Sequence, residues 1–125
     1  MNESVYFIGL GGSGMLPLAR LAHLRGCRVG GSDPRLASLS DSFADWEVST
    51  DPRPELLKRY DKIVYSSAIP ADHPERTQAG SRALHRMDFL LEVARAYPVQ
   101  MAVAGTHGKT GTTSLLGWML RGLGL

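Results

Sequence analysis

Residues 5–15 read Val-Tyr-Phe-Ile-Gly-Leu-Gly-Gly-Ser-Gly-Met, and the rest of the chain is organised around this stretch. The four apolar residues at its start predict a buried strand. The glycines at positions 9, 11 and 14 match the pattern G-x-G-x-x-G, which turns the chain between a strand and a helix. Apolar residues follow at helical spacing, so we expect a helix over about 13–25 that ends at Gly26.

A strand, a glycine turn and a helix in this order are typical of an anion-binding site. Residues without a Cβ atom let a phosphate approach the backbone N–H groups at the start of the helix, where the helix dipole favours negative charge. Asp33 follows a second predicted strand, Arg28–Ser32, where an acidic residue often meets the ribose or another polar part of a nucleotide. The stretch therefore predicts a nucleotide or diphosphate site. A turn that only packs the strand on the helix is the alternative.

Composition narrows the class of protein. The 125 residues carry a net charge of +2, and no basic run with interleaved aromatic residues suggests a nucleic-acid partner. Cys27 is the single cysteine and cannot form an internal disulfide, which fits a reducing compartment. The apolar runs are short for a membrane span and the N-terminus is unlike a signal peptide, so we expect a cytoplasmic protein without a membrane partner.

The remaining chain alternates short apolar segments with amphipathic ones. We expect strands at 47–49, 62–65 and 83–86, and helices at 36–46, 54–60, 74–80 and 87–96. This alternation predicts an α/β fold with a doubly wound, mostly parallel sheet and helices on both faces.

In such a sheet, ligands bind at the carboxyl ends of the strands. The glycine turn, Asp33 and the loop Ser66-Ser67-Ala68-Ile69 would all lie along that edge. The hydroxyl groups of Ser66 and Ser67 could contact a sugar, a base or a phosphate. A small-residue turn with capping hydroxyls explains the loop equally well.

The last part of the chain predicts a second phosphate loop. Residues 100–104 read as a strand, Gly105-Thr106-His107-Gly108-Lys109-Thr110 follows, and a helix is expected over about 111–122. The sequence departs from a full Walker A loop because Val103 stands where that pattern has glycine. Backbone amides would cradle the phosphates of ATP, Lys109 would neutralise the β- and γ-phosphates, and the Thr110 hydroxyl would ligate Mg²⁺. His107 is interpreted as a positioning residue.

Taken together, the two loops make the chain similar to a known family. The segments Gly9–Met15, Gly31–Asp33, Ser66–Pro70 followed by Pro74-Glu75, and Ala102–Thr110 occur in the order and spacing of the Mur ligases. The resemblance implies a Rossmann-like UDP-substrate domain over 1–98. It also implies that 99–125 is the truncated start of a central ATPase domain, with one strand, the ATP loop and one helix.

The resemblance also implies substrates and residue roles. Gly11, Gly12, Ser13, Gly14 and Met15 would surround the diphosphate of UDP-N-acetylmuramate, and Asp33 with Ser66, Ser67, Ala68 and Ile69 would contact the uridine side. Gly105, Thr106, His107, Gly108, Lys109, Thr110 and Gly111 would bind ATP. Lys109 and Thr110 would serve phosphoryl transfer, with Mg²⁺ on Thr110. In the full-length enzymes ATP activates a carboxylate that an amine, here expected to be L-alanine, then attacks.

Other functions stay open from the sequence. A related ligase that adds a preformed peptide, a non-catalytic NAD-binding module and a regulatory nucleotide sensor each explain part of it. We expect the fragment to bind the UDP-sugar without ligating. The apolar surface of the last helix, which includes Leu115, Trp118 and Leu123, demands cover. We therefore expect this helix to fold back on the first domain, to exchange between chains, or to drive self-association.

Overall fold

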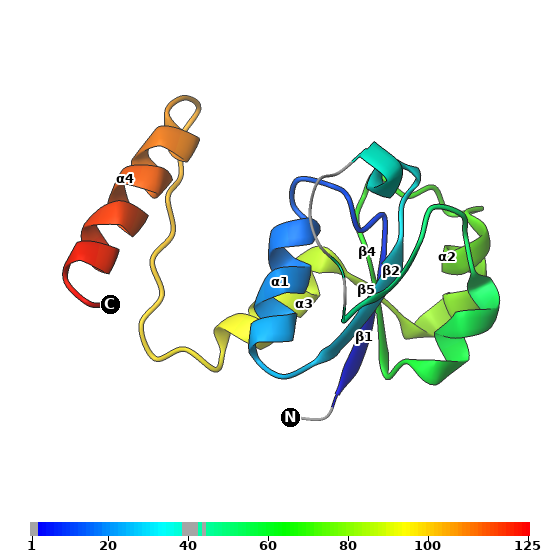
Figure 1. Ribbon diagram of the computed structural model, residues 1–125. Helices are drawn as coiled ribbons and strands as arrows, with labels where there is room; N and C mark the ends of the chain where they lie inside the picture. The colour runs from blue at the N-terminus through cyan, green and yellow to red at the C-terminus, as the bar shows by residue number, and fades with distance from the viewer. Residues whose placement is uncertain (1–2, 39–42, 44) are drawn as a thin grey trace.

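A computed structural model describes residues 3–38, 43 and 45–125 (Figure 1). Its strands are β1 (Ser4–Ile8), β2 (Arg28–Ser32), β3 (Glu47–Ser49), β4 (Lys62–Tyr65) and β5 (Ala83–His85). Its helices are α1 (Leu16–Leu24), α2 (Pro74–Ala79), α3 (Arg86–Ala94) and α4 (Lys109–Gly122), with 3₁₀ helices η1 (Pro34–Ser38), η2 (Pro54–Arg59) and η3 (Gly80–Arg82). Within these described residues, no helix combines the length and hydropathy needed to cross a membrane.

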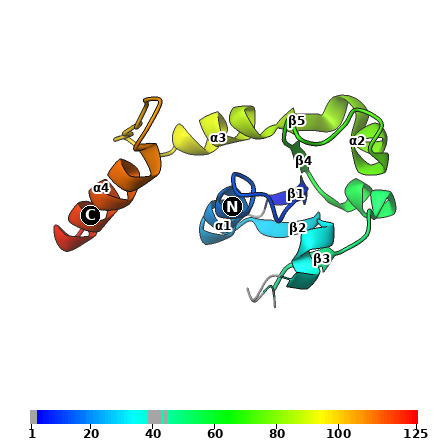
Figure 2. The same cartoon turned by 90° about the horizontal axis from the view of Figure 1, so that it is seen from above.

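The strands form one sheet in the order β3-β2-β1-β4-β5, and every neighbouring pair is parallel. The central strand β1 is buried on both faces because its side chains alternate between two layers. Val5 and Phe7 pack in the layer that holds α1 and α3, whereas Tyr6 and Ile8 pack against residues of η2 and α2. Figure 2 shows the helices on the two sides of the sheet. The expected doubly wound parallel fold is confirmed.

Three predicted helices differ from those in the structure. The helix expected from about residue 13 begins at Leu16, because the Gly12 carbonyl accepts the N–H groups of Met15 and Leu16 and keeps the preceding residues in a turn. The helix expected over 36–46 is represented by η1, which ends at Ser38; residues 39–42 and 44 lie outside the described part. The short helix expected at 54–60 is the 3₁₀ helix η2.

The strand expected at 100–104 is wrong. This segment is extended but forms no ladder, since no neighbouring strand supplies partners for its backbone groups. The helix that follows, α4, stands apart from the sheet (Figure 1), so it does not fold back on the first domain. Trp118 is 74% exposed on it. Exchange between chains and self-association through α4 stay predictions.

Candidate ligand-binding site

The glycine turn leaves two backbone donors facing outward. Gly9 adopts a left-handed φ of 78°, and its carbonyl accepts the N–H of Gly12 at 3.0 Å. Within residues 3–38, 43 and 45–125, the N–H groups of Ser13 and Gly14 donate no hydrogen bond. Both residues are exposed at the entry to α1, so their amides are free to bind an anion.

The other glycines of the pattern provide room rather than unusual backbone angles. A Cβ atom on Gly11 would lie 3.1 Å from the carboxyl carbon of Asp33, and one on Gly14 would collide with the guanidinium of Arg86. Within the pattern, a positive φ is found only at Gly9. The turn therefore needs a left-handed backbone at Gly9 and the absence of a Cβ atom at Gly11 and Gly14.

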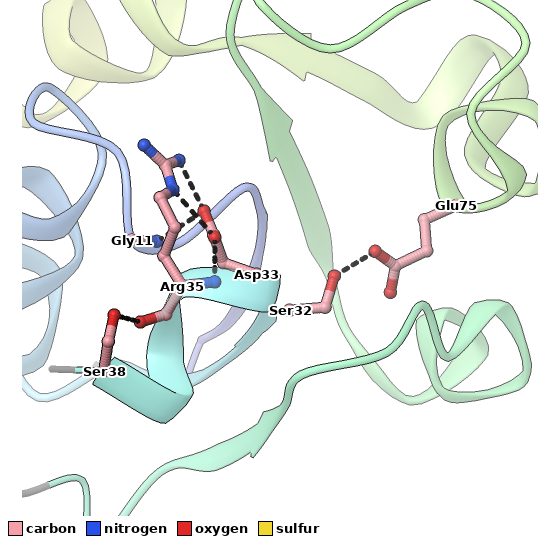
Figure 3. Close-up of polar contacts among 6 residues, drawn as sticks. All are labelled: Gly11, Ser32, Asp33, Arg35, Ser38 and Glu75. Carbon is pink, nitrogen blue, oxygen red and sulfur yellow. Dashed lines mark hydrogen bonds and ion pairs between the residues drawn. The ribbon is translucent and has the colours of Figure 1, made fainter.

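Asp33 is a buried carboxylate that holds the turn and an arginine together. Its side chain is 2% exposed, and its oxygens accept hydrogen bonds from the N–H of Gly11 at 3.0 Å and of Arg35 at 2.8 Å. The guanidinium of Arg35 adds two more, from Nε at 2.9 Å and from Nη2 at 2.6 Å (Figure 3). Burial opposes ionisation, but these hydrogen bonds outweigh it and hold the pKa of Asp33 below its usual range.

The lowered pKa of Asp33 predicts a loss of stability in acid. A carboxyl with a depressed folded-state pKa stabilises the fold above its unfolded-state value of about 4, and this contribution disappears as pH falls through the lower folded-state value. We expect Asp33→Asn to cost about 2 kcal/mol of unfolding free energy at pH 7, the value typical of hydrogen bonds to charged groups, and clearly less at pH 2. Urea denaturation at both pH values measures this difference. The exposed Asp72→Asn serves as the control, and a cost that does not change with pH would contradict the prediction.

A cleft of about 290 Å³ opens over the glycine turn. We call it the glycine-turn cleft. It is lined by Gly9, Gly12, Ser13, Gly14, Met15, Arg35, Ser66, Ser67, Ala68, Ile69 and Arg86. Arg35 Nη2 lies 3.6 Å from the position of a Cβ on Gly12, and Arg86 reaches Gly14 from the first turn of α3. Two guanidinium groups therefore flank the two free amides, and this arrangement favours a ligand with two or more negative charges.

A second cleft, also of about 290 Å³, adjoins the first at the end of β2. We call it the β2-end cleft. Its lining combines the end of β2 with the segment after β3 and the residue that precedes α2, and it shares Gly9, Arg35, Ala68 and Ile69 with the glycine-turn cleft. Thr50, Pro52 and His73 belong to the β2-end cleft alone. The two clefts together follow the carboxyl edge of the sheet.

The loop Ser66–Ile69 between the clefts is tied down by three hydrogen bonds. The N–H of Ile69 donates to the carbonyl of Ser66 at 3.0 Å, and Arg76 Nη1 donates to the carbonyl of Ile69 at 2.7 Å. Ser67 Oγ lies 2.9 Å from Nε2 of His85. The loop is therefore a hydrogen-bonded turn whose residues line the clefts, and its role in binding stays a prediction.

The structure brings most of the predicted substrate residues together. Eight of them line the glycine-turn cleft: Gly12, Ser13, Gly14, Met15, Ser66, Ser67, Ala68 and Ile69. Asp33 lines the β2-end cleft, and Gly11 lines neither, because its N–H is bonded to Asp33. The pattern analysis missed Arg35 and Arg86. Only the position of Arg35 next to the acidic residue offered a signal, and Arg86 sits in a strand-to-helix junction with no motif of its own.

The predicted ATP loop lies outside both clefts. Residues 105–110 are exposed, Gly108 adopts a φ of 77°, and α4 begins at Lys109 as the phosphate-loop pattern requires. Across the described residues, no group of three or more His, Cys, Asp or Glu side chains could hold a metal ion. A single hydroxyl such as that of Thr110 fits Mg²⁺, which keeps several waters and takes its other ligands from substrate phosphates.

The strand order and the clefts at the carboxyl edge define a doubly wound α/β domain of the nucleotide-binding kind. A model described as the Mur ligase family, catalytic domain, matches residues 4–98. The chain belongs to the Mur ligase family.

Two curated relatives carry the same enzyme name. The UDP-N-acetylmuramate–L-alanine ligase of Clostridium botulinum is 35% identical over 120 residues, which cover 92% of this chain and 26% of the relative. The protein of the same name from Frankia casuarinae is 38% identical over an alignment of 135 residues, which covers 99% of this chain and 27% of the relative. The chain thus spans about a quarter of the length of the curated relatives it matches.

Solved structures show the same fold. UDP-N-acetylmuramate-alanine ligase MurC from Thermotoga maritima superposes with a TM-score of 0.79 at 24% identity, covering 96% of this chain and 29% of that one. A murein peptide ligase from Psychrobacter arcticus gives a TM-score of 0.81 at 28% identity. The match covers 98% of this chain and 27% of that chain.

Proposed function

We propose that this chain is the N-terminal part of an ATP-dependent UDP-N-acetylmuramate–L-alanine ligase of peptidoglycan precursor synthesis, and that by itself it binds UDP-N-acetylmuramate. The observation that carries the proposal is the glycine-turn cleft, where the free amides of Ser13 and Gly14 lie between two guanidinium groups. These donors match the charge and size of a nucleotide-sugar diphosphate. The relatives' shared enzyme name supports the choice of sugar and amino acid.

In this proposal each cleft takes one part of the ligand. The diphosphate binds over Gly12, Ser13, Gly14 and Met15, and the uridine extends past Ala68 and Ile69 into the β2-end cleft. In this proposal Asp33 supports the uridine side and keeps Arg35 and the Gly11 amide in place. Ser66 and Ser67 supply hydroxyl donors at the boundary between the clefts.

The second phosphate loop belongs to the chemical step of the full-length enzyme. We divide the chain into a UDP-substrate domain at 1–98 and the start of an ATPase domain at 99–125. Gly105, Thr106, His107, Gly108 and Gly111 would surround the phosphates of ATP, Lys109 would pair with the transferring phosphate, and Thr110 would hold Mg²⁺, which spreads the developing charge. The muramoyl carboxylate would take the γ-phosphate, and attack by the amine of L-alanine would release phosphate as the amide forms.

Calorimetric titration of the pure chain tests the proposal. UDP-N-acetylmuramate, UDP-N-acetylglucosamine, NAD and Mg-ATP are titrated in parallel. Saturable binding of the muramate, without ATP-dependent ligation, is the expected result. Binding of NAD and of neither UDP-sugar would overturn the proposal in favour of a dinucleotide-binding module, and ligation by the fragment would refute its inactivity.

A ligase that adds a preformed peptide is the second candidate, and the likeness to the murein peptide ligase of Psychrobacter arcticus favours it. Both candidates would use the same clefts for the nucleotide sugar. They differ in the amine that attacks the activated carboxylate. Phosphate release by the full-length enzyme with L-alanine, compared with release in the presence of a muramoyl-type peptide, distinguishes them.

Arg86 should contribute directly to diphosphate affinity. Because its guanidinium lies beside Gly14 and lines the glycine-turn cleft, we expect Arg86→Ala to weaken binding of UDP-N-acetylmuramate by roughly 10- to 100-fold, the range for a hydrogen bond to a charged group, and Arg86→Lys to recover part of the loss. The salt dependence of binding should also become shallower. Arg95→Ala, at the exposed residue that directly follows the same helix, is the matched control. Equal affinity of the Arg86 and Arg95 variants would contradict the prediction.

A further inference from the structure

Glu75 is a fully buried carboxylate outside both clefts. Its side chain is 0% exposed, although it belongs to the first turn of the short helix α2. It accepts hydrogen bonds from the hydroxyl groups of Tyr6 on β1 and Ser32 on β2. Its oxygen Oε2 also accepts the backbone N–H of Arg53 at 3.0 Å. One carboxylate therefore ties α2, two strands and the segment after β3 together.

The segment that Glu75 holds is a wall of the β2-end cleft. Thr50 and Pro52 line this cleft, and Arg53 follows them directly. Prolines stand on either side of Arg53, so its N–H is the backbone donor that can anchor this stretch between residues 52 and 54. This N–H donates its hydrogen bond to the carboxylate of Glu75.

Glu75 also contacts two other parts of that cleft, one through its carboxylate and one through its backbone N–H. Figure 3 shows the side chain of Ser32 reaching toward Glu75, whereas Asp33, the next residue, reaches toward Gly11 and Arg35. The backbone N–H of Glu75 donates to Nδ1 of His73 at 3.2 Å, and His73 lines the cleft. Glu75 thus touches three of the segments that shape the β2-end cleft without entering it.

We propose that Glu75 is a positioning residue for nucleotide binding: through Arg53 and Ser32 its carboxylate sets the wall of the cleft that receives the uridine part of the ligand. This inference rests on the proposed function for the identity of the ligand. The geometric requirement is reach rather than charge. A glutamine keeps one oxygen for Tyr6 and Arg53 and turns its N–H₂ toward Ser32, whose hydroxyl can accept as well as donate.

Three variants separate positioning from general stabilisation. Glu75→Asp keeps the charge but withdraws the carboxylate by about 1.5 Å, one C–C bond length, so it cannot reach all three donors. We expect it to bind UDP roughly tenfold more weakly, the loss of about one net hydrogen-bond equivalent, and to bind inorganic pyrophosphate as the unmodified chain does. Glu75→Gln should bind both probes within about twofold of the unmodified chain, since it keeps the network.

Tyr6→Phe is the matched control because it removes one donor to Glu75 but leaves the contact with Arg53 in place. We expect a lower melting temperature with unchanged UDP affinity. UDP binding by Glu75→Asp at the unmodified level, or equal losses of UDP and pyrophosphate, would overturn the inference.

Hydrogen exchange of the Arg53 amide tests the positioning without any ligand. The Arg53 amide should be protected in the unmodified chain and in Glu75→Gln, and it should exchange faster in Glu75→Asp. Equal protection of this amide in all three proteins would overturn the inference. If the unmodified chain fails to bind UDP while these exchange rates differ as expected, the proposed ligand fails and the positioning role of Glu75 stands.

Discussion

Replacing Gly31 with alanine should remove much of the stability of the domain. Gly31 lies in β2 directly opposite Phe7 of β1, the central strand. A Cβ at this position would stand 2.5 Å from the carbonyl oxygen of Phe7 and 3.0 Å from the Cβ of Leu10. Neither atom can move aside, because the Phe7 oxygen belongs to the backbone of β1 and Leu10 is fully buried in the glycine turn.

We expect Gly31→Ala to cost about 3 kcal/mol or more, the upper part of the range for overpacked cores. Most domains are stable by only about 5–15 kcal/mol, so the melting temperature should fall by roughly 15 °C. Thermal unfolding followed by circular dichroism measures the effect. Gly117→Ala is the control, because a Cβ there meets nothing within 4 Å in α4. A melting temperature within a few degrees of the unmodified chain would show that β1 and β2 can separate at low cost.

The layer structure of the domain could be predicted from the sequence because its strands are short, apolar and bounded by turn residues. Five of the expected strands, including 47–49 and 62–65, appear within one residue of their expected bounds. The failure at 100–104 has a physical cause. Its apolar pattern is that of a strand, but a strand needs a partner, and the sheet of the described residues ends at β5.

The candidate site was predictable where it depends on glycine and small residues, since these mark places where the backbone itself meets a ligand. The charged residues of the site could not be predicted in this way. Arg35 lines the site because two of its guanidinium nitrogens donate hydrogen bonds to the buried carboxylate of Asp33. Arg86 lines the site because Gly14 has no Cβ atom to occupy the same space. Both depend on contacts between residues far apart in the chain or on burial, which one sequence does not display. The role proposed for Glu75 could not be predicted from the sequence for the same reason.

A carboxylate placed in the glycine turn should abolish ligand binding. Ser13 is exposed, lines the glycine-turn cleft and carries one of the two free amides. In Ser13→Asp a negative charge would stand where the proposed diphosphate lies. Like charges about 4 Å apart repel by about 1–4 kcal/mol at effective dielectric constants between those of water and a protein surface. With two phosphate groups, we expect affinity for UDP-N-acetylmuramate to fall at least about 100-fold.

Two comparisons show whether this loss is electrostatic. Ser13→Ala removes the hydroxyl without adding charge and should weaken binding only a few-fold, roughly the value of one neutral hydrogen bond. Ser81→Asp adds the same charge at an exposed position before β5, at the opposite end of the strands, and should leave affinity unchanged. Raising the salt concentration should narrow the gap between Ser13→Asp and Ser13→Ala, because exposed charges are screened. If Ser13→Asp binds as tightly as Ser81→Asp, the charged part of the ligand does not lie at the glycine turn, and the free amides of Ser13 and Gly14 serve another purpose.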